Sequence, residues 1–208
     1  MTHGSGSSRS RSSRVWMRLS FWIGIGLGVA LTVVACQLPY LDWSSAAPPI
    51  DARPLTIRHD AKGSGQFFAP RSGRRHHRGV DLVAALNSPV HAIRSGIVVQ
   101  VGLHRGLGRF VEIEHRHHLH SLYAHLNDVR VEPGLRLRQG TIIGTVGKTG
   151  NARHPWITPH LHLEVLRDGE PIDPQTIGLQ VVDPSTPLIA RERQPSEPSE
   201  SDDASGGE

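Results

Sequence analysis

Cysteine and aromatic residues are scarce in this chain of 208 residues. Its one cysteine, Cys36, rules out an internal disulfide and any zinc site built from several cysteines. Aromatic residues make up only 5% of the sequence, whereas histidine occurs 14 times. The hydrophobic content of 37% suits one globular domain with additional segments. Candidate metal ligands must therefore come from imidazoles and carboxylates.

Acidic residues are missing from the first 36 positions, which contain four arginines. The whole chain has 23 Lys and Arg and 19 Asp and Glu, so the remainder has 19 residues of each sign. The sequence pI of about 10.0 therefore reflects the N-terminal segment and says little about nucleic acid. We expect no nucleic-acid partner.

The run LSFWIGIGLGVALTVVAC, residues 19–36, is uncharged and apolar and follows a basic leader. This pattern predicts one hydrophobic helix that acts as a signal peptide or a membrane anchor, with the arginines on the cytoplasmic side. The ending VVAC resembles the lipobox of bacterial lipoproteins, which implies lipidation of Cys36 and removal of everything before it. Both alternatives place the rest of the chain in the bacterial cell envelope, facing away from the cytoplasm.

Two segments of biased composition border the middle of the chain. Residues 37–54 are rich in Pro, Ser and Ala and show no helical or strand period, which predicts a linker. Residues 181–208 are acidic and poor in apolar side chains, which predicts a disordered tail. The working domain is therefore expected at residues 55–180.

Short apolar runs between turn signals fill this domain. GRFVEIEH alternates apolar Val111 and Ile113 with Glu112 and Glu114, and an Asp-Gly pair at 168–169 marks a hairpin turn. No segment of the domain reads as a convincing amphipathic helix. The pattern predicts a mainly β fold, an antiparallel sandwich or partly open barrel with a substrate groove.

Two histidines stand out in the strand-like run PHLHLEV, residues 159–165. Because strand side chains alternate between faces, Leu161 and Leu163 are expected in the core, while His160, His162 and Glu164 point the other way. The two imidazoles are then about 7 Å apart at their Cα atoms. Such a pair suits one metal ligand and one neighbouring catalytic group.

A second candidate motif is HHRGVDL, residues 76–82. His77 and Asp81 would lie about 13 Å apart in a flat strand, too far to share one ion, so the segment must bend. Gly79 between them offers the freedom to bend. His76 is a competing ligand or an exposed neighbour.

Other histidines and one lysine carry weaker signals. His125 is isolated in the strand-like run LYAHL, where a core histidine is the simpler interpretation. The run HRHHLH, residues 115–120, favours a solvated hairpin over a metal site. VGKTG around Lys148 lacks the glycine that a phosphate loop needs five residues before Gly147, so no nucleotide partner is expected.

Three spaced motifs together resemble the LytM/lysostaphin-type zinc metallopeptidases of bacterial cell walls. They are His77-x-Gly79-x-Asp81, Tyr123-Ala124-His125-Leu126 and Pro159-His160-Leu161-His162, in that order. The resemblance covers roughly residues 57–177 and implies a duplicated hybrid motif fold. It further implies one zinc ion per domain, bound by His77, Asp81 and His162, with His125 and His160 as catalytic residues. The implied substrate is a peptide of peptidoglycan.

The implied chemistry is zinc-assisted hydrolysis of a peptide bond. Zinc lowers the pKa of water, and a nearby histidine can take up and return a proton. We expect His160 to be the general base and His125 to stabilise the oxyanion or share the proton, although the two roles can be exchanged. Glu164 either orients a ligand histidine or is an ordinary solvent-facing charge, and the latter is preferred. Trp156 either lines the groove or packs its loop.

The alternative is a catalytically silent relative that binds or activates another cell-wall hydrolase. Silent members of such a family lack one or more of the five positions, whereas this sequence has all of them. An active endopeptidase is therefore the expected function.

Overall fold

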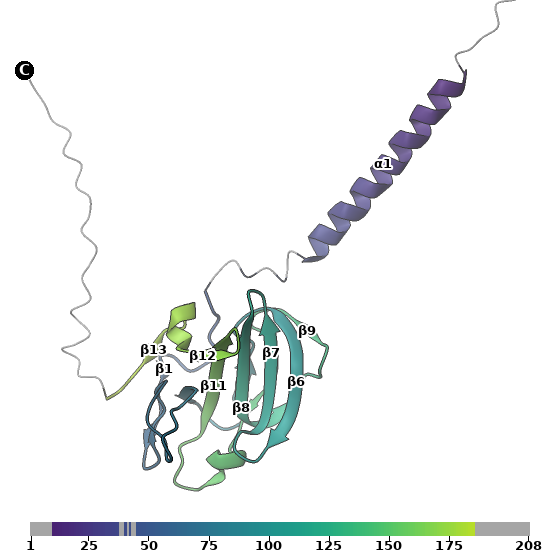
Figure 1. Cartoon of the computed structure of the whole chain (residues 1–208). Helices are drawn as coiled ribbons and strands as arrows, with labels where there is room; N and C mark the ends of the chain where they lie inside the picture. The colour runs from purple at the N-terminus through teal and green to yellow at the C-terminus, as the bar shows by residue number, and fades with distance from the viewer. Residues whose placement is uncertain (1–9, 38–39, 41, 43–44, 186–208) are drawn as a thin grey trace, which may run out of the picture.

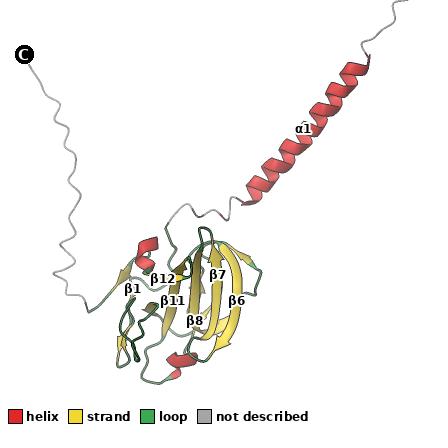
Figure 2. Ribbon diagram, in the orientation of Figure 1, coloured by secondary structure: helices red, strands yellow, loops and turns green. Residues whose placement is uncertain are grey.

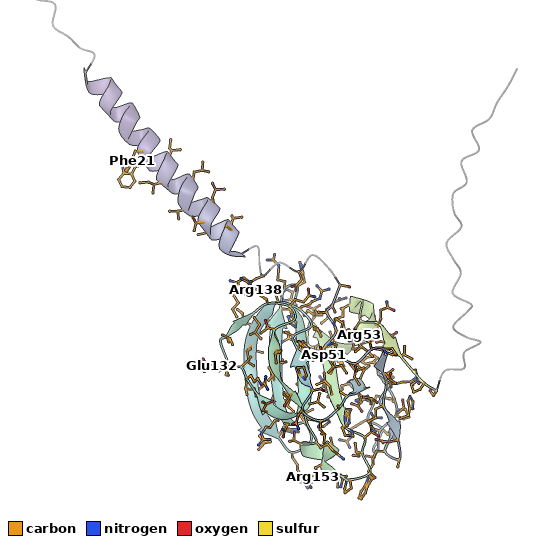
Figure 3. All side chains as sticks on the ribbon, turned by 180° about the vertical axis from the view of Figure 1, so that it is seen from behind. Phe21, Asp51, Arg53, Glu132, Arg138 and Arg153 are labelled. Carbon is orange, nitrogen blue, oxygen red and sulfur yellow. The ribbon has the colours of Figure 1, made fainter. Side chains whose placement is uncertain are left out.

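The computed structural model describes residues 10–37, 40, 42 and 45–185. A long helix, α1 (Ser10–Gln37), precedes a β domain that contains all of the strands (Figures 1 and 2). The described side chains of α1, residues 21–35, are exposed, and Phe21 projects from the helix (Figure 3). Within the described residues, no helix combines the length and the hydropathy that a membrane crossing requires. The helix α1 matches the predicted N-terminal hydrophobic helix. Its attachment to a membrane stays a prediction.

One antiparallel sheet of nine strands forms the body of the domain (Figure 1). Its strands lie in the order β12-β11-β8-β7-β6-β9, β4 pairs with β11, and β10 pairs with both β5 and β8. The strand bounds are β4 Gly79–Val83, β5 Pro89–His91, β6 Gly96–His104, β7 Gly108–His115, β8 Leu119–Val129, β9 Arg136–Leu137, β10 Ile142–Val146, β11 His160–Arg167 and β12 Glu170–Ile172. The sheet is not closed into a barrel, so the predicted mainly β, partly open fold is confirmed.

Small elements complete the domain. β1 (Leu55–Thr56) pairs in parallel with β13 (Val181–Val182), and β2 (His59–Asp60) pairs with β3 (Gly63–Ser64). Two short 3-10 helices, η2 (Gly150–Arg153) and η3 (Pro174–Ile177), lie in loops. No α-helix occurs between residues 45 and 185, as the sequence predicts.

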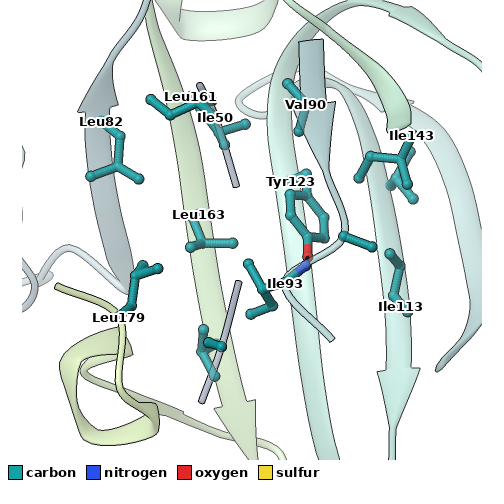
Figure 4. Packing of buried hydrophobic residues seen from close by; sticks show 14 of the residues in the cluster. Ile50, Leu82, Val90, Ile93, Ile113, Tyr123, Ile143, Leu161, Leu163 and Leu179 are labelled. Carbon is teal, nitrogen blue, oxygen red and sulfur yellow. Dashed lines mark hydrogen bonds between the residues drawn. The ribbon is translucent and has the colours of Figure 1, made fainter. Parts of the chain in front are cut away.

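The core is formed by side chains from the long strands together with residues of β5 and β10, such as Val90 and Ile143 (Figure 4). Leu161, Leu163 and Val165 are fully buried on one face of β11, as the alternation predicts. On β7, Val111 and Ile113 are equally buried, while Glu114 is exposed. Full burial of each such aliphatic side chain is worth about 1.5–3 kcal/mol, which fixes the register of these strands.

The turns follow their sequence signals with one exception. Asp168 and Gly169 both have positive φ, at 52° and 84°, which is the geometry of the predicted hairpin turn. His117 and His118 also have positive φ in the exposed turn between β7 and β8. The exception is His115, at the end of β7, which is buried and not solvated. Its Nδ1 lies 2.9 Å from Ser95 O and its Nε2 lies 2.7 Å from Ser121 Oγ.

The domain boundaries stay predictions, but two observations bear on them. Within the predicted linker, Ala46 and Ile50 are buried in the core, and Ile50 bridges to Val90. The first two residues past the predicted end of the domain form β13, which pairs with β1. The predicted tail lies outside the described residues from position 186 onward.

Candidate metal centre

The pairing of β4 with β11 builds the centre. In this antiparallel pair Asp81 stands directly opposite His162, so both side chains project from the face of the sheet opposite the core. His77 lies two residues before β4 and is held by two backbone hydrogen bonds: its N–H donates to Ala69 O and its carbonyl accepts from Phe68 N–H, each at 2.9 Å. This loop brings the His77 ring over the pair.

Three atoms converge closely enough to share one ion. His77 Nε2 lies 3.0 Å from His162 Nδ1 and 3.1 Å from Asp81 Oδ1. His162 Nδ1 lies 2.8 Å from Asp81 Oδ1. All three residues are buried, and among the described residues they form the one group of three or more histidine, cysteine or carboxylate side chains that could hold a metal.

In each proposed ligand, the nitrogen or oxygen atom that points away from the ion site also has a hydrogen-bond partner. His77 Nδ1 lies 2.8 Å from Gln66 O, and His162 Nε2 lies 3.1 Å from Glu164 Oε1. Arg58 donates from Nη2 to Asp81 Oδ2 at 2.8 Å. Such partners fix ring orientation and tautomer in metal sites. Two imidazole nitrogens and one carboxylate oxygen, each held from behind, fit the donor set of catalytic zinc.

Two expectations about this region, on Glu164 and Gly79, need correction, and the open alternative for His76 is decided. Glu164 is not a solvent-facing charge: its exposed fraction is 8%, and it contacts His162. Gly79 is needed for close strand packing and not for a bend. A Cβ at this position would lie 2.2 Å from Leu163 O, so the missing side chain lets β11 approach β4. His76 is the exposed neighbour, with its ring stacked on Phe68 at 4.1 Å between centroids.

The two predicted catalytic histidines lie beside the ligands. The ring of His125 lies 5.0 Å from that of His160 and 5.8 Å from that of His162, between centroids. His160 Nε2 is 3.9 Å from Asp81 Oδ1. Each ring has its Nδ1 against a backbone carbonyl, Thr149 O at 2.9 Å for His125 and Thr158 O at 2.6 Å for His160. The Nδ1 atoms therefore carry protons, which leaves each Nε2 as an acceptor.

A bulge in β8 turns His125 into the site. The register with β7 shifts between Arg109 and Val111, and His125 has a φ of 62°. Strict alternation after Tyr123, which is in the core, would put Ala124 on the metal side and return His125 to the core. Positive φ in a non-glycine residue costs about 1–3 kcal/mol and persists where the surroundings hold it. Here the His125 N–H donates to Leu107 O at 2.8 Å.

Burial and charge set the protonation of these groups. Burial lowers the pKa of His125 to about 3 and also lowers the pKa of His160, so both are neutral at pH 7. Burial would raise the pKa of Asp81, but hydrogen bonds and charge from His162 and His77 hold it well below its ordinary value. Burial alone would lower the pKa of metal-free His162, but its contacts with Asp81 and Glu164 raise it to about 9.

Sequence reasoning missed a supporting network behind the ligands. Buried Arg58 forms ion pairs with Asp60 and with Asp81. Asp60 Oδ2 accepts from Thr158 N–H at 3.0 Å, and Thr158 O in turn faces His160. The network thus links a proposed ligand to a proposed catalytic residue. No local pattern marks Arg58 or Asp60 as part of the site, because the residues that they connect, Asp81 and Thr158, lie far away in sequence.

Trp156 is exposed by 57% and its ring stacks on His154 at 5.1 Å between centroids. It therefore does not pack its loop against the core.

Comparison with known proteins places this geometry in a family. Residues 75–174 match Peptidase family M23. The peptidoglycan DD-endopeptidase ShyC of Vibrio cholerae is 37% identical over 103 residues, which are 50% of this chain and 23% of ShyC. The matched part of the chain spans between 22% and 43% of the length of ShyC and the other curated relatives.

Two solved structures share the fold. A zinc-containing peptidase from Vibrio cholerae is 28% identical with a TM-score of 0.53, over 66% of this chain and 41% of that one. A mutant catalytic domain of the prophage-encoded M23 protein EnpA from Enterococcus faecalis is 27% identical with a TM-score of 0.50, over 62% of this chain and 96% of that one. The family predicted from the three motifs is confirmed. Residues 75–174 therefore form a domain of Peptidase family M23.

Proposed function

We propose that this protein is a zinc-dependent endopeptidase that hydrolyses peptide bonds in peptidoglycan. The observation that carries the proposal is the convergence of five predicted residues from three distant segments, the proposed ligands His77, Asp81 and His162 with His125 and His160 beside them. The similarity to ShyC, a peptidoglycan DD-endopeptidase, supports the substrate class.

Zinc would be held by His77, Asp81 and His162, and when bound it supplies a Lewis acid that polarises a carbonyl and acidifies water. His160 is the proposed general base, because its Nε2 is an unprotonated acceptor 3.9 Å from the Asp81 ligand oxygen. His125 also offers an acceptor at Nε2. It can therefore stabilise a developing oxyanion only after it has taken up a proton, and we assign it the sharing of that proton.

Removing a ligand and removing the base should have different consequences. His162→Ala should lose both zinc and activity, because one of three ligands is gone. His160→Ala should keep stoichiometric zinc and lose about 10²–10⁴-fold in turnover, the usual worth of general acid–base catalysis. Atomic absorption measures zinc, and mass analysis of fragments from purified peptidoglycan, with and without chelator, measures cleavage.

The control variant is His76→Ala, which should change neither zinc content nor turnover because His76 is exposed and outside the cluster. Retention of full zinc by the His162 variant would remove the ligand assignment. A zinc-loaded wild-type protein that releases no fragments would favour the silent, partner-binding alternative.

A further inference from the structure

A row of paired side chains crosses the sheet, beginning on the strand that carries His162. The face opposite the core, which carries His162 and Glu164, is called the metal face here. Glu164 on β11 stands opposite Leu122 on β8, Leu122 opposite Glu112 on β7, and Glu112 opposite Gln100 on β6. Directly paired residues of antiparallel strands project from the same face. The row therefore starts beside a proposed metal ligand and runs over four strands.

A hollow of about 310 Å³ lies at the far part of this row. It is lined by Gln100, Gly102, Leu103, His104, Leu107, Phe110, Glu112 and Leu122. Strands lie about 4.8 Å apart, so β7 is about 10 Å from β11. The wall of the hollow is joined to the metal centre, because Leu107 O accepts the hydrogen bond from His125 N–H at 2.8 Å.

The charge of this lining is negative or neutral. It contains one carboxylate and no lysine or arginine. His104 Nδ1 accepts hydrogen bonds from the N–H groups of Gly106 and Leu107, at 3.1 Å and 3.3 Å. At Nδ1, His104 therefore presents no N–H to the hollow. The hollow thus combines apolar walls with the acceptor oxygens of Glu112 and Gln100.

Glu112 is held in place and still reachable. One of its oxygens, Oε1, lies 3.1 Å from His120 Nδ1, and about a quarter of the side chain is exposed. A fixed carboxylate at the edge of an apolar hollow is suited to a charge-assisted hydrogen bond with an ammonium group. An extended peptide advances about 3.3 Å per residue, so a peptide laid across the sheet would need about three residues to pass from β11, the strand of His162, to the hollow.

We infer that the hollow is a substrate subsite in which Glu112 selects a peptide bearing a primary ammonium group about three residues from the bond that is cut. This inference rests on the proposed endopeptidase function and adds a specificity to it. The ammonium could come from a free α-amino end or from the side chain of a diamino acid. Both sources share the same chemistry, and differently acetylated substrates distinguish them.

The test uses the full chain, purified in detergent and loaded with zinc. The substrates are cross-linked peptides with both amines free, with only the α-amine acetylated, or with only the side-chain amine acetylated. Acetylation of the recognised amine should lower kcat/KM about tenfold, as for loss of one partly exposed charge-assisted hydrogen bond. On the substrate with free amines, Glu112→Gln should lower kcat/KM by about the same factor. On the substrate whose recognised amine is acetylated, Glu112→Gln should have the same kcat/KM as wild type.

Glu114→Gln is the matched control, because Glu114 lies two residues along the same strand on the same face but outside the lining of the hollow. It should behave as wild type on every substrate. An equal loss by Glu112→Gln on free and acetylated forms would overturn the inference, as would no loss on either. The proposed function fails differently, since a zinc-loaded wild type would then cleave none of the substrates.

Calorimetry on the zinc-free protein gives a second measurement that does not require turnover. The amine-bearing cleavage peptide should bind about tenfold more weakly to Glu112→Gln than to wild type or to Glu114→Gln. Equal affinity for all three proteins would place the amine elsewhere and overturn the subsite.

Discussion

At the scale of single residues, the outward-facing atom of each proposed ligand matters as much as the atom that faces the ion. His162 presents Nδ1 to Asp81 and His77 because Nε2 is taken by Glu164. Asp81 presents Oδ1 because Oδ2 is taken by Arg58. The sequence identifies the ligands by type and spacing, but these partners fix which atom of each is available. Tautomer and oxygen choice are therefore set by contacts that span the whole domain.

Replacing Glu164 by Gln should lower zinc affinity about 10- to 100-fold, the usual effect of removing a carboxylate that orients a ligand histidine. The shape of the side chain is kept, so the loss reports on charge and orientation. Competition with a chromophoric chelator measures the dissociation constant. Glu170→Gln, an exposed change on β12, is the control. An unchanged constant for the Glu164 variant would make Glu164 a bystander.

At the scale of elements, strand pairing places the ligands. Asp81 and His162 meet because β4 and β11 pair in one register, and that register is held by fully buried Leu82, Leu161 and Leu163. Gly79 permits this pairing, since any side chain there would meet the backbone of β11. The β8 bulge then adds His125 to the same face. Strand alternation predicted that His162 projects away from the core, but it could not predict the placement of Asp81 or the bulge.

Gly79→Ala should therefore push β4 from β11 and separate Asp81 from His162. A forced backbone contact of this kind typically costs about 1–3 kcal/mol in the free energy of unfolding, and zinc affinity should fall with it. Gly106→Ala is the control, because a Cβ there has ordinary contacts no closer than 3.4 Å. Urea unfolding of the zinc-free proteins gives the stabilities. If Gly79→Ala matches wild type in both measurements, the close approach of β11 is not limiting.

At the scale of the whole molecule, buried histidines make stability depend on pH. His115 lies away from the metal centre, and burial lowers its pKa to about 4. Between pH 6.5 and about 4, His115 is protonated in the unfolded chain but not in the folded protein. The free energy of unfolding therefore falls as the pH falls. A shift of this size corresponds to about 3 kcal/mol of stability at full effect.

In His115→Gln the free energy of unfolding should therefore fall less between pH 6.5 and 4 than in wild type. Urea unfolding of the zinc-free proteins at several pH values measures this slope. His118→Gln, in the exposed turn, should leave the slope as in wild type. Equal slopes for wild type and the His115 variant would show that His115 titrates normally in the folded state.

The N-terminal segment is predicted to be either a lipoprotein signal or a membrane anchor. If Cys36 is the lipidated residue that its VVAC context predicts, a fatty-acid probe should label the protein in bacterial cells and Cys36→Ser should abolish the label. Labelling should coincide with loss of residues 1–35, measured as a lower mass. An unlabelled wild-type protein that retains its full length and sediments with membranes would instead indicate an uncleaved anchor.

The sequence by itself determined the strand alternation, the hairpin turns and the chemical types of the five site residues. These features were readable because side-chain period and turn conformation depend on neighbours a few residues apart. Only the tertiary structure decided that Glu164 is buried, that His125 leaves the core side of β8, and that Arg58 stands behind Asp81. The physical reason is that these outcomes depend on contacts between distant segments, such as the pair Asp81 and His162, which are 81 positions apart.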